Sequence, residues 1–118
     1  MTEEDLLQEE IVIWFRKKYS YKSADPFAII FSVPNGGKRG WFDAKVLQAT
    51  GLLAGVTDLL VVHDGITYYI ELKTKTGTLQ KSQKVFKKML TMAGCADKWH
   101  LVRSLEDFKN VLKEIGLN

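Results

Sequence analysis

The stretch DLLVVHDGITYYIELKTK, residues 58–75, decides the fold, because it is typical of two β-strands joined by a tight turn. Two apolar runs flank Asp64-Gly65, a dipeptide that favours a two-residue hairpin turn. The register that this turn sets places Asp58 directly opposite Glu71 across the two strands. An apolar hairpin therefore carries two facing carboxylates.

Two facing carboxylates need a physical reason. Directly opposed residues of a hairpin have Cβ atoms about 4.5–5.5 Å apart, so Asp58 and Glu71 repel each other. A divalent cation between them removes the repulsion, because hard cations prefer carboxylate oxygens. Lys73 lies two residues after Glu71 and shares its side of the strand. The hairpin thus predicts two acids and an ammonium group on one sheet face.

An N-terminal helix over residues 3–19 is predicted to supply another acid. Thr2 can cap this helix, and its acidic first turn suits the helix dipole. The apolar stripe at helical spacing consists of Leu6, Leu7, Ile11, Ile13 and Trp14. Glu10 falls near the centre of that stripe, where a carboxylate is costly unless it is paired or metal-bound. We therefore expect Glu10 to reach the hairpin, with Glu9 and Glu4 as alternatives in the same segment.

A second amphipathic helix is predicted over residues 79–93. Gln83 stands in its apolar row, which contains Leu79, Phe86 and Leu90. A polar amide in such a row usually has a specific partner. We expect Gln83 to belong to the same site.

These residues together predict a metal-dependent hydrolytic site. The groups expected to hold one or two Mg²⁺ ions are Glu10, Asp58, Glu71 and the backbone carbonyl of Leu72. The metal would lower the pKa of a bound water and stabilise charge on a phosphodiester oxygen. Lys73 would orient that water or stabilise the pentavalent phosphate, and Gln83 would position Lys73 or a phosphate.

The remaining segments complete an α/β domain. They are a strand over 27–33, a short helix over 43–50, the hairpin over 56–74, a strand over 98–103 and a last helix from Ser104 to about Ile115. The order α-β-(α)-β-β-α-β-α indicates a central mixed β-sheet flanked by helices. With 118 residues and no linker or repeat, residues 1–118 are expected to form one domain.

Composition excludes several classes of protein. No run approaches the roughly 18 apolar residues of a membrane span, so no membrane partner is expected. The acidic N-terminus is not a secretory signal. Cys95 is the only cysteine, which rules out an internal disulfide and a cysteine zinc site, and a reducing cytoplasm is expected.

Basic residues are candidates for contact with an anionic partner, and the net charge of +3 is compatible with one. The expected DNA-binding residues are Lys38, Arg39, Lys75, Lys81 and Lys84. Lys38 and Arg39 follow Asn35-Gly36-Gly37, where glycines let backbone N–H groups approach an anion. A solvated turn and a solvated helix face are the alternative interpretations. Trp41 is the aromatic candidate for stacking on a base or for a dimer interface.

Asp58, a gap of twelve residues and Glu71-Leu72-Lys73 form a pattern that resembles the PD-(D/E)xK nuclease superfamily. Further segments are similar in order and spacing to its VRR-NUC (virus-type replication-repair nuclease) family: EEDLLQEEIVIWF, PNGGKRG, GLLAGVTDLLVV and YYIELKTKTGTLQKSQKVFKKMLTMAG. The resemblance covers residues 3–103. Thr57 departs from it, because the family usually has proline there, and we expect this to alter only the strand entry.

The resemblance implies a restriction-endonuclease-like fold and a DNA endonuclease that needs Mg²⁺ or Mn²⁺ and no organic cofactor. The site residues that it implies are Glu10, Asp58, Glu71, Lys73 and Gln83. Stand-alone members of this size look like phage or bacterial proteins, and some are homodimers that cut four-way (Holliday) junctions. We therefore expect a homodimer acting on branched DNA in the cytoplasm, that of the bacterial host if the protein is phage-encoded. A nuclease subunit that needs a partner protein and a non-catalytic nucleic-acid-binding module are the alternatives.

Overall fold

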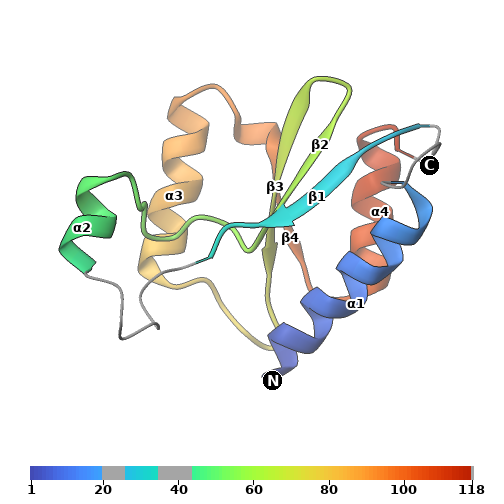
Figure 1. The fold of residues 1–118 in the computed structure, drawn as a ribbon, viewed down its shortest axis with the longest axis horizontal. Coiled ribbons are helices and arrows are strands. Elements are labelled where there is room, and N and C mark those ends of the chain that lie inside the picture. Colours follow the sequence, from blue (N-terminus) through green and yellow to red (C-terminus); the bar gives the residue numbers. More distant parts are fainter. Residues whose placement is uncertain (20–25, 35–43, 118) are drawn as a thin grey trace.

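The computed structural model describes residues 1–19, 26–34 and 44–117 (Figure 1). Its elements in chain order are α1 (Glu3–Lys18), β1 (Ile29–Ser32), α2 (Ala44–Ala49), β2 (Leu59–His63), β3 (Ile66–Leu72), α3 (Lys81–Met92), the 3₁₀ helix η2 (Ala96–Lys98), β4 (Trp99–Val102) and α4 (Leu105–Glu114). The predicted order is confirmed. The strands β1 and β4 are shorter than predicted.

The four strands form one mixed sheet in the order β1-β2-β3-β4. The β1–β2 and β2–β3 pairs are antiparallel, whereas β4 runs parallel to β3. Asp64 and Gly65 have φ angles of 52° and 75°, the left-handed values that a tight hairpin turn requires. Leu59 pairs with Ile70, so the predicted register is confirmed and its continuation by one residue places Asp58 opposite Glu71.

The sheet separates two layers of helices (Figure 1). Helices α1 and α4 cover one face, where Ile11 and Phe15 pack with Phe108 and Ile70 in the main core. Helix α3 lies on the other face. Because side chains alternate along a strand, Glu71 faces the side opposite to Ile70. The candidate acids therefore lie on the face of the sheet opposite to the main core.

Local signals set the helix ends. Thr2 caps α1 and forms a reciprocal capping box with Asp5, and the Ser104 hydroxyl accepts a hydrogen bond from the Asp107 N–H at the start of α4. Gly94 follows α3 with a φ of 87°, a left-handed conformation that glycine adopts readily after a helix. Residue 43, where the helix α2 was predicted to begin, lies outside the described residues. Within the described ranges, none of the helices combines the length and the apolar character needed to cross a membrane.

The predicted orientation of α1 is wrong in part, because Leu7, Ile11 and Trp14 pack against the main core and the other two residues of the predicted stripe do not. Ile11 and Phe15 are its fully buried residues, whereas Leu6 and Ile13 are 53% and 50% exposed. Glu10 is exposed as well. The apolar residues of α1 lie on more than one side of the helix, and the pair that packs against Phe108 decides which side faces the sheet. A helical wheel treats all of them alike and so centred the buried side on Glu10 instead of on Ile11 and Phe15.

Two isoleucines of α1 test this orientation. Ile11→Ala removes a fully buried side chain and should lower the free energy of unfolding by about 2–5 kcal/mol. Ile13→Ala removes the same atoms from a half-exposed position and should cost less than about 1 kcal/mol. Urea unfolding of both variants measures the difference. Equal losses would contradict the observed orientation of the helix.

Candidate functional site

Asp58 lies at the open end of the hairpin, where the neighbouring strand holds its side chain in place. Its Oδ2 accepts a hydrogen bond of 2.7 Å from the backbone N–H of Leu72 on the neighbouring strand. The residue before it, Thr57, is fully buried, and its hydroxyl donates to the carbonyl oxygen of Leu59 at 3.3 Å. Thr57 thus fixes the entry into β2. The carboxylate of Asp58 is directed across to β3.

Glu71 is an acid in an almost closed environment. Its side chain is only 1% exposed. Gln83 Nε2 donates to Glu71 Oε2 at 3.3 Å, whereas Glu71 Oε1 is buried without a hydrogen-bond partner in the described part of the chain. A buried carboxylate oxygen without a partner is costly unless a cation or a proton compensates for it.

The charge state of Glu71 reflects these surroundings. Burial is the largest cause that raises its pKa, and the neighbouring Asp58 is the next, because a second carboxyl group beside Glu71 favours its protonated form. Lys73 lowers the pKa and Glu4 raises it by smaller amounts, and the balance raises the pKa of Glu71 from 4.5 to about 9. In metal-free protein Glu71 therefore holds a proton at neutral pH, which a bound cation would displace.

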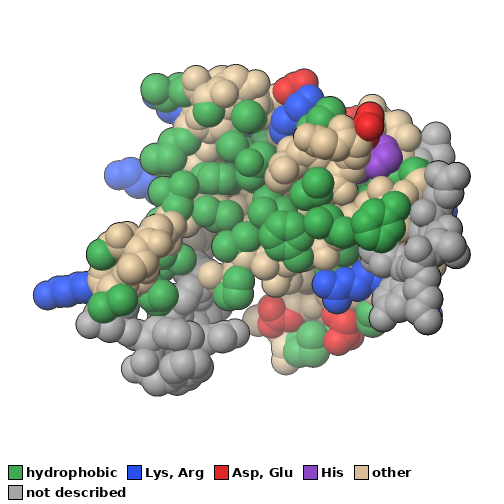
Figure 2. Space-filling view, turned by 45° about the horizontal axis from the view of Figure 1, so that its top comes forward, with side chains coloured by type: hydrophobic (Ala, Val, Ile, Leu, Met, Phe, Trp, Pro, Cys, Tyr) green, Lys and Arg blue, Asp and Glu red, His purple; other side chains and the backbone are tan. Residues whose placement is uncertain are grey.

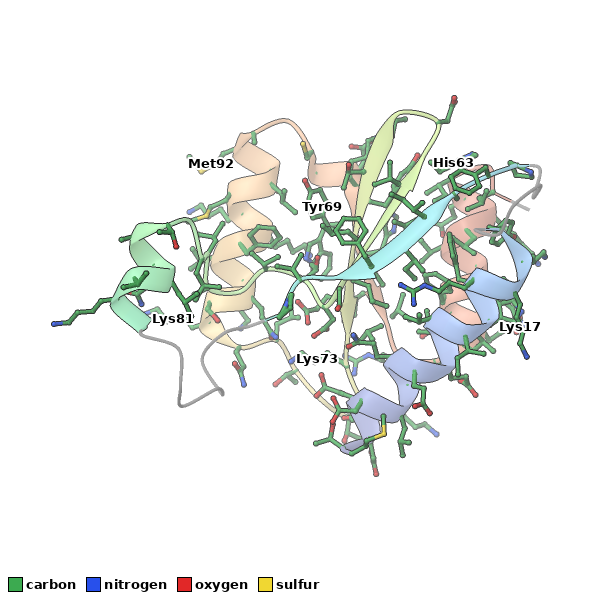
Figure 3. All side chains as sticks on the ribbon, in the orientation of Figure 1. Lys17, His63, Tyr69, Lys73, Lys81 and Met92 are labelled. Carbon is green, nitrogen blue, oxygen red and sulfur yellow. The ribbon has the colours of Figure 1, made fainter. Side chains whose placement is uncertain are left out.

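Lys73 continues β3 beside the acids. Its side chain is 6% exposed, and its backbone N–H donates to the carbonyl oxygen of Val102 at 3.1 Å, which extends the pairing of β3 with β4. Figure 3 labels it where the end of β3 lies between α1 and α3. The expected grouping of Asp58, Glu71 and Lys73 is thus found on one side of the hairpin.

Arg103 secures the loop that follows Lys73. Its Nη1 donates to the carbonyl oxygens of Thr74 at 2.6 Å, Lys75 at 3.3 Å and Gly77 at 2.8 Å. The sequence reading missed this residue, because a single arginine after a strand carries no signal of which carbonyls it meets. Arg103 is a positioning residue for the end of β3.

Gln83 belongs to the first turn of α3. Its Oε1 accepts a hydrogen bond of 2.8 Å from the backbone N–H of Gln80, while its Nε2 binds Glu71. Its amide is therefore fixed at both ends. Gln83 thus contacts Glu71, whereas the sequence suggested that it positions Lys73 or a phosphate.

Gly55 allows the loop before Asp58 to pack closely against the same turn of α3. Its φ is 83°, and a Cβ atom at this position would overlap the backbone carbonyl of Ser82. Any side chain would therefore push the loop and the helix apart. The sequence reading missed this contact too, although a glycine three residues before the candidate acid was the available signal.

A cleft of about 320 Å³ opens beside these residues. Its lining comes from α1, the end of β1, the 55–58 loop and the start of α3, and includes Gln8, Ser32, Asp58, Gln80 and Gln83. The cleft gives a substrate access to Asp58 from solvent.

Helix α1 presents Glu4, not Glu10, to this region. Glu4 is half-buried on the side that Ile11 and Phe15 share, and its charge acts on Glu71. Glu10 is exposed, so the structure does not bring it to the site as expected. Among the described residues, no three His, Cys, Asp or Glu side chains gather closely enough to hold a metal ion by themselves.

The donor set nevertheless fits a divalent cation. Glu71 offers a buried oxygen without a hydrogen-bond partner in the described ranges, and Asp58 adds a second carboxylate beside it. Oxygen ligands of this kind suit Mg²⁺ or Mn²⁺, which keep several waters and need only one or two protein carboxylates. The backbone carbonyl of Leu72 is the further oxygen that the sequence suggested.

The candidate DNA-binding lysines lie around this region only in part. Lys75, Lys81 and Lys84 are exposed, on the loop after β3 and the start of α3. Lys38, Arg39 and Trp41 lie outside the described residues. Lys81 and Lys84 flank Gln83 in the first turn of α3, whereas Lys75 lies on the loop that Arg103 secures.

Comparison with known proteins identifies the fold. A solved structure described as a VRR_NUC domain protein superposes with a TM-score of 0.67 at 19% sequence identity, over 97% of this chain and 88% of the other. No protein-family profile matches the sequence, and no curated protein matches it. The expected resemblance to the VRR-NUC fold is thus confirmed at the level of structure.

The raised pKa of Glu71 predicts an unusual pH dependence of stability. Between its ordinary pKa of 4.5 and the folded value of about 9, the folded chain keeps a proton that the unfolded chain releases. Rising pH therefore favours unfolding in this window. In metal-free buffer, the free energy of unfolding of the wild-type protein should fall between pH 5 and pH 8 by more than about 1 kcal/mol beyond any fall in Glu71→Gln.

Urea unfolding at the two pH values measures this loss. Glu10→Gln, which changes an exposed glutamate of α1, is the control and should keep the wild-type dependence. An equal change in the free energy of unfolding of wild type and Glu71→Gln between the two pH values would contradict a raised pKa of Glu71.

Proposed function

We propose that this chain is a DNA endonuclease that hydrolyses phosphodiester bonds with Mg²⁺ or Mn²⁺. The observation that carries the proposal is the buried Glu71, which has an unpartnered oxygen in the described structure and lies opposite Asp58 and beside Lys73. Nothing in a purely structural role requires two acids to face each other in a buried position. Hydrolysis of a phosphodiester requires both a cation site and a nearby positive side chain.

Each residue has a proposed part in the reaction. Asp58, Glu71 and the Leu72 carbonyl would hold the metal, which supplies Lewis acidity toward water and a phosphodiester oxygen. The N–H of Leu72 fixes Asp58, and Gln83 fixes Glu71. The ammonium group of Lys73 would stabilise negative charge on the phosphate or orient the attacking water. Glu4 replaces Glu10 as the proposed acid of α1.

DNA would enter along the cleft beside Asp58. The proposed phosphate contacts are Lys75, Lys81 and Lys84 together with Lys38 and Arg39, because lysine and arginine neutralise the backbone without reading its sequence. Branched DNA such as a four-way junction is the proposed substrate. This choice follows from the resemblance to junction-cutting relatives and from the proposed dimer below.

A cleavage assay tests the nuclease and its residues together. A labelled four-way junction and a matched linear duplex are incubated with Mg²⁺, Mn²⁺ or EDTA. Lys73→Met keeps the buried stem but removes the charge, and it should slow cutting about 10²–10³-fold. Glu4→Gln should also slow cutting, whereas its matched control Glu10→Gln should cut like wild type.

The outcomes of this assay separate the alternatives. Cutting of both DNAs at equal rates would keep the nuclease and discard the junction preference. DNA binding without cutting would favour a subunit that needs a partner protein or a non-catalytic binding module. Equal effects of the Glu4 and Glu10 changes would contradict the proposed role of Glu4.

We also propose that the protein is a homodimer, with β1 at its interface. An apolar surface extends over the sheet from this edge strand (Figure 2). The exposed side chains at β1 are Phe27, Ile29, Phe31 and Val33, each between 37% and 56% exposed. Soluble monomers rarely expose large contiguous apolar patches. A second copy related by a two-fold axis would cover this patch and would match the symmetry of a four-way junction.

Sedimentation at micromolar concentration tests the dimer. Wild type should be dimeric, and Phe31→Asp should shift it to monomer by placing a charge in the apolar interface. Ile13→Asp, at a half-exposed apolar position on the opposite side of the sheet, is the matched control and should remain dimeric. A monomeric wild type, or dissociation of both variants alike, would contradict an interface at β1.

A further inference from the structure

A second hollow lies between α1 and α4, away from the residues that line the cleft. Its volume is about 310 Å³. Its polar rim consists of Lys18, Lys109, Lys113 and Glu106, and its apolar floor includes Trp14, Tyr19 and Leu112. We call it the lysine groove. Nothing in the proposed chemistry at Asp58 uses it.

An anchored aromatic ring forms the floor of the lysine groove. Trp14 makes edge-to-face contacts with Tyr19 at 5.9 Å and Phe108 at 6.2 Å between ring centroids. The Nζ atoms of Lys18 and Lys109 each lie 5.2 Å from the centroid of the Trp14 ring. Cation–π attraction holds an ammonium group over a ring in this way. The indole thus holds two positive charges at the same hollow.

The charges of the lysine groove are not balanced by the protein. Three lysines line it against the single acid Glu106, and none of the three forms an ion pair within the described ranges. Lys109 and Lys113 are one helical turn apart, so they lie on the same side of α4. Lys18 adds a third positive charge from α1. An anion in the groove would relieve the repulsion among these charges.

We infer that the lysine groove binds phosphodiester groups of the DNA backbone, as a second contact away from the cutting site. This inference rests on the proposed nuclease function and deepens it. Glu4 and Lys18 lie at opposite ends of α1, about 20 Å apart at 1.5 Å per residue. The groove is therefore separated from Glu4, the proposed acid of α1, by most of the length of that helix.

DNA binding in EDTA, where no cutting occurs, tests the groove by itself. Each lysine that contacts a phosphate contributes about one unit to the slope of log affinity against log salt. Lys109→Gln/Lys113→Gln should reduce that slope by about two and weaken binding at least about tenfold. Lys18→Gln should reduce it by about one. The adjacent Lys17→Gln, an exposed lysine that does not line the groove, is the matched control and should leave the slope unchanged (Figure 3).

Three results would overturn the inference. One is an unchanged slope in the groove variants. Another is a loss of unfolding free energy without loss of DNA affinity, because Lys18 and Lys113 would then only compensate the dipoles of the helix ends where they lie. The third is saturable binding of inorganic phosphate that depends on the groove lysines while DNA binding does not, which would indicate a site for a free anion.

The cleavage assay keeps the two proposals distinguishable. If the groove variants bind DNA like wild type but the protein still cuts, only the groove inference fails. If the groove variants lose affinity but wild type does not cut with any metal, the groove stands and the nuclease proposal fails.

Discussion

The placement of Glu71 opposite Asp58 is the constraint on which the rest of the structure depends. Both acids lie at the mouth of an apolar hairpin, and Glu71 is almost fully buried. Without a cation the protein compensates by keeping a proton on Glu71, as its raised pKa shows. The proposed divalent metal would remove both the proton and the repulsion, and would so relieve the cost of burying the two acids together.

The surrounding elements hold this pair in position. The Leu72 N–H fixes Asp58, and Gln83 fixes Glu71 from the first turn of α3. Gly55 allows the loop before Asp58 to pack directly against that turn. Arg103 secures the carbonyls of the loop after Lys73. Each contact joins two parts of the chain that are far apart in sequence, and together they fix the geometry of the candidate site.

Local signals explain why the hairpin was predictable and why the side of α1 that faces the sheet was not. Asp64-Gly65 fixes the turn, and the turn fixes the register, so the pairing of Asp58 with Glu71 follows from short-range geometry. The choice between Glu10 and Glu4 depends instead on which side of α1 packs against Phe108. The contacts of Gly55 and Arg103 likewise depend on segments that approach only in the folded chain. Sequence patterns carry no direct record of such tertiary contacts.

Calorimetric titration of the metal-free protein with Mn²⁺ at pH 7 tests the central claim most directly. Performed in buffers of different ionisation enthalpy, it measures both metal affinity and proton release. Because Glu71 is protonated before binding, about one proton should leave per bound ion, and Asp58→Asn and Glu71→Gln should abolish the binding. Binding without proton release, or unchanged affinity in both variants, would contradict a metal site at this pair of acids.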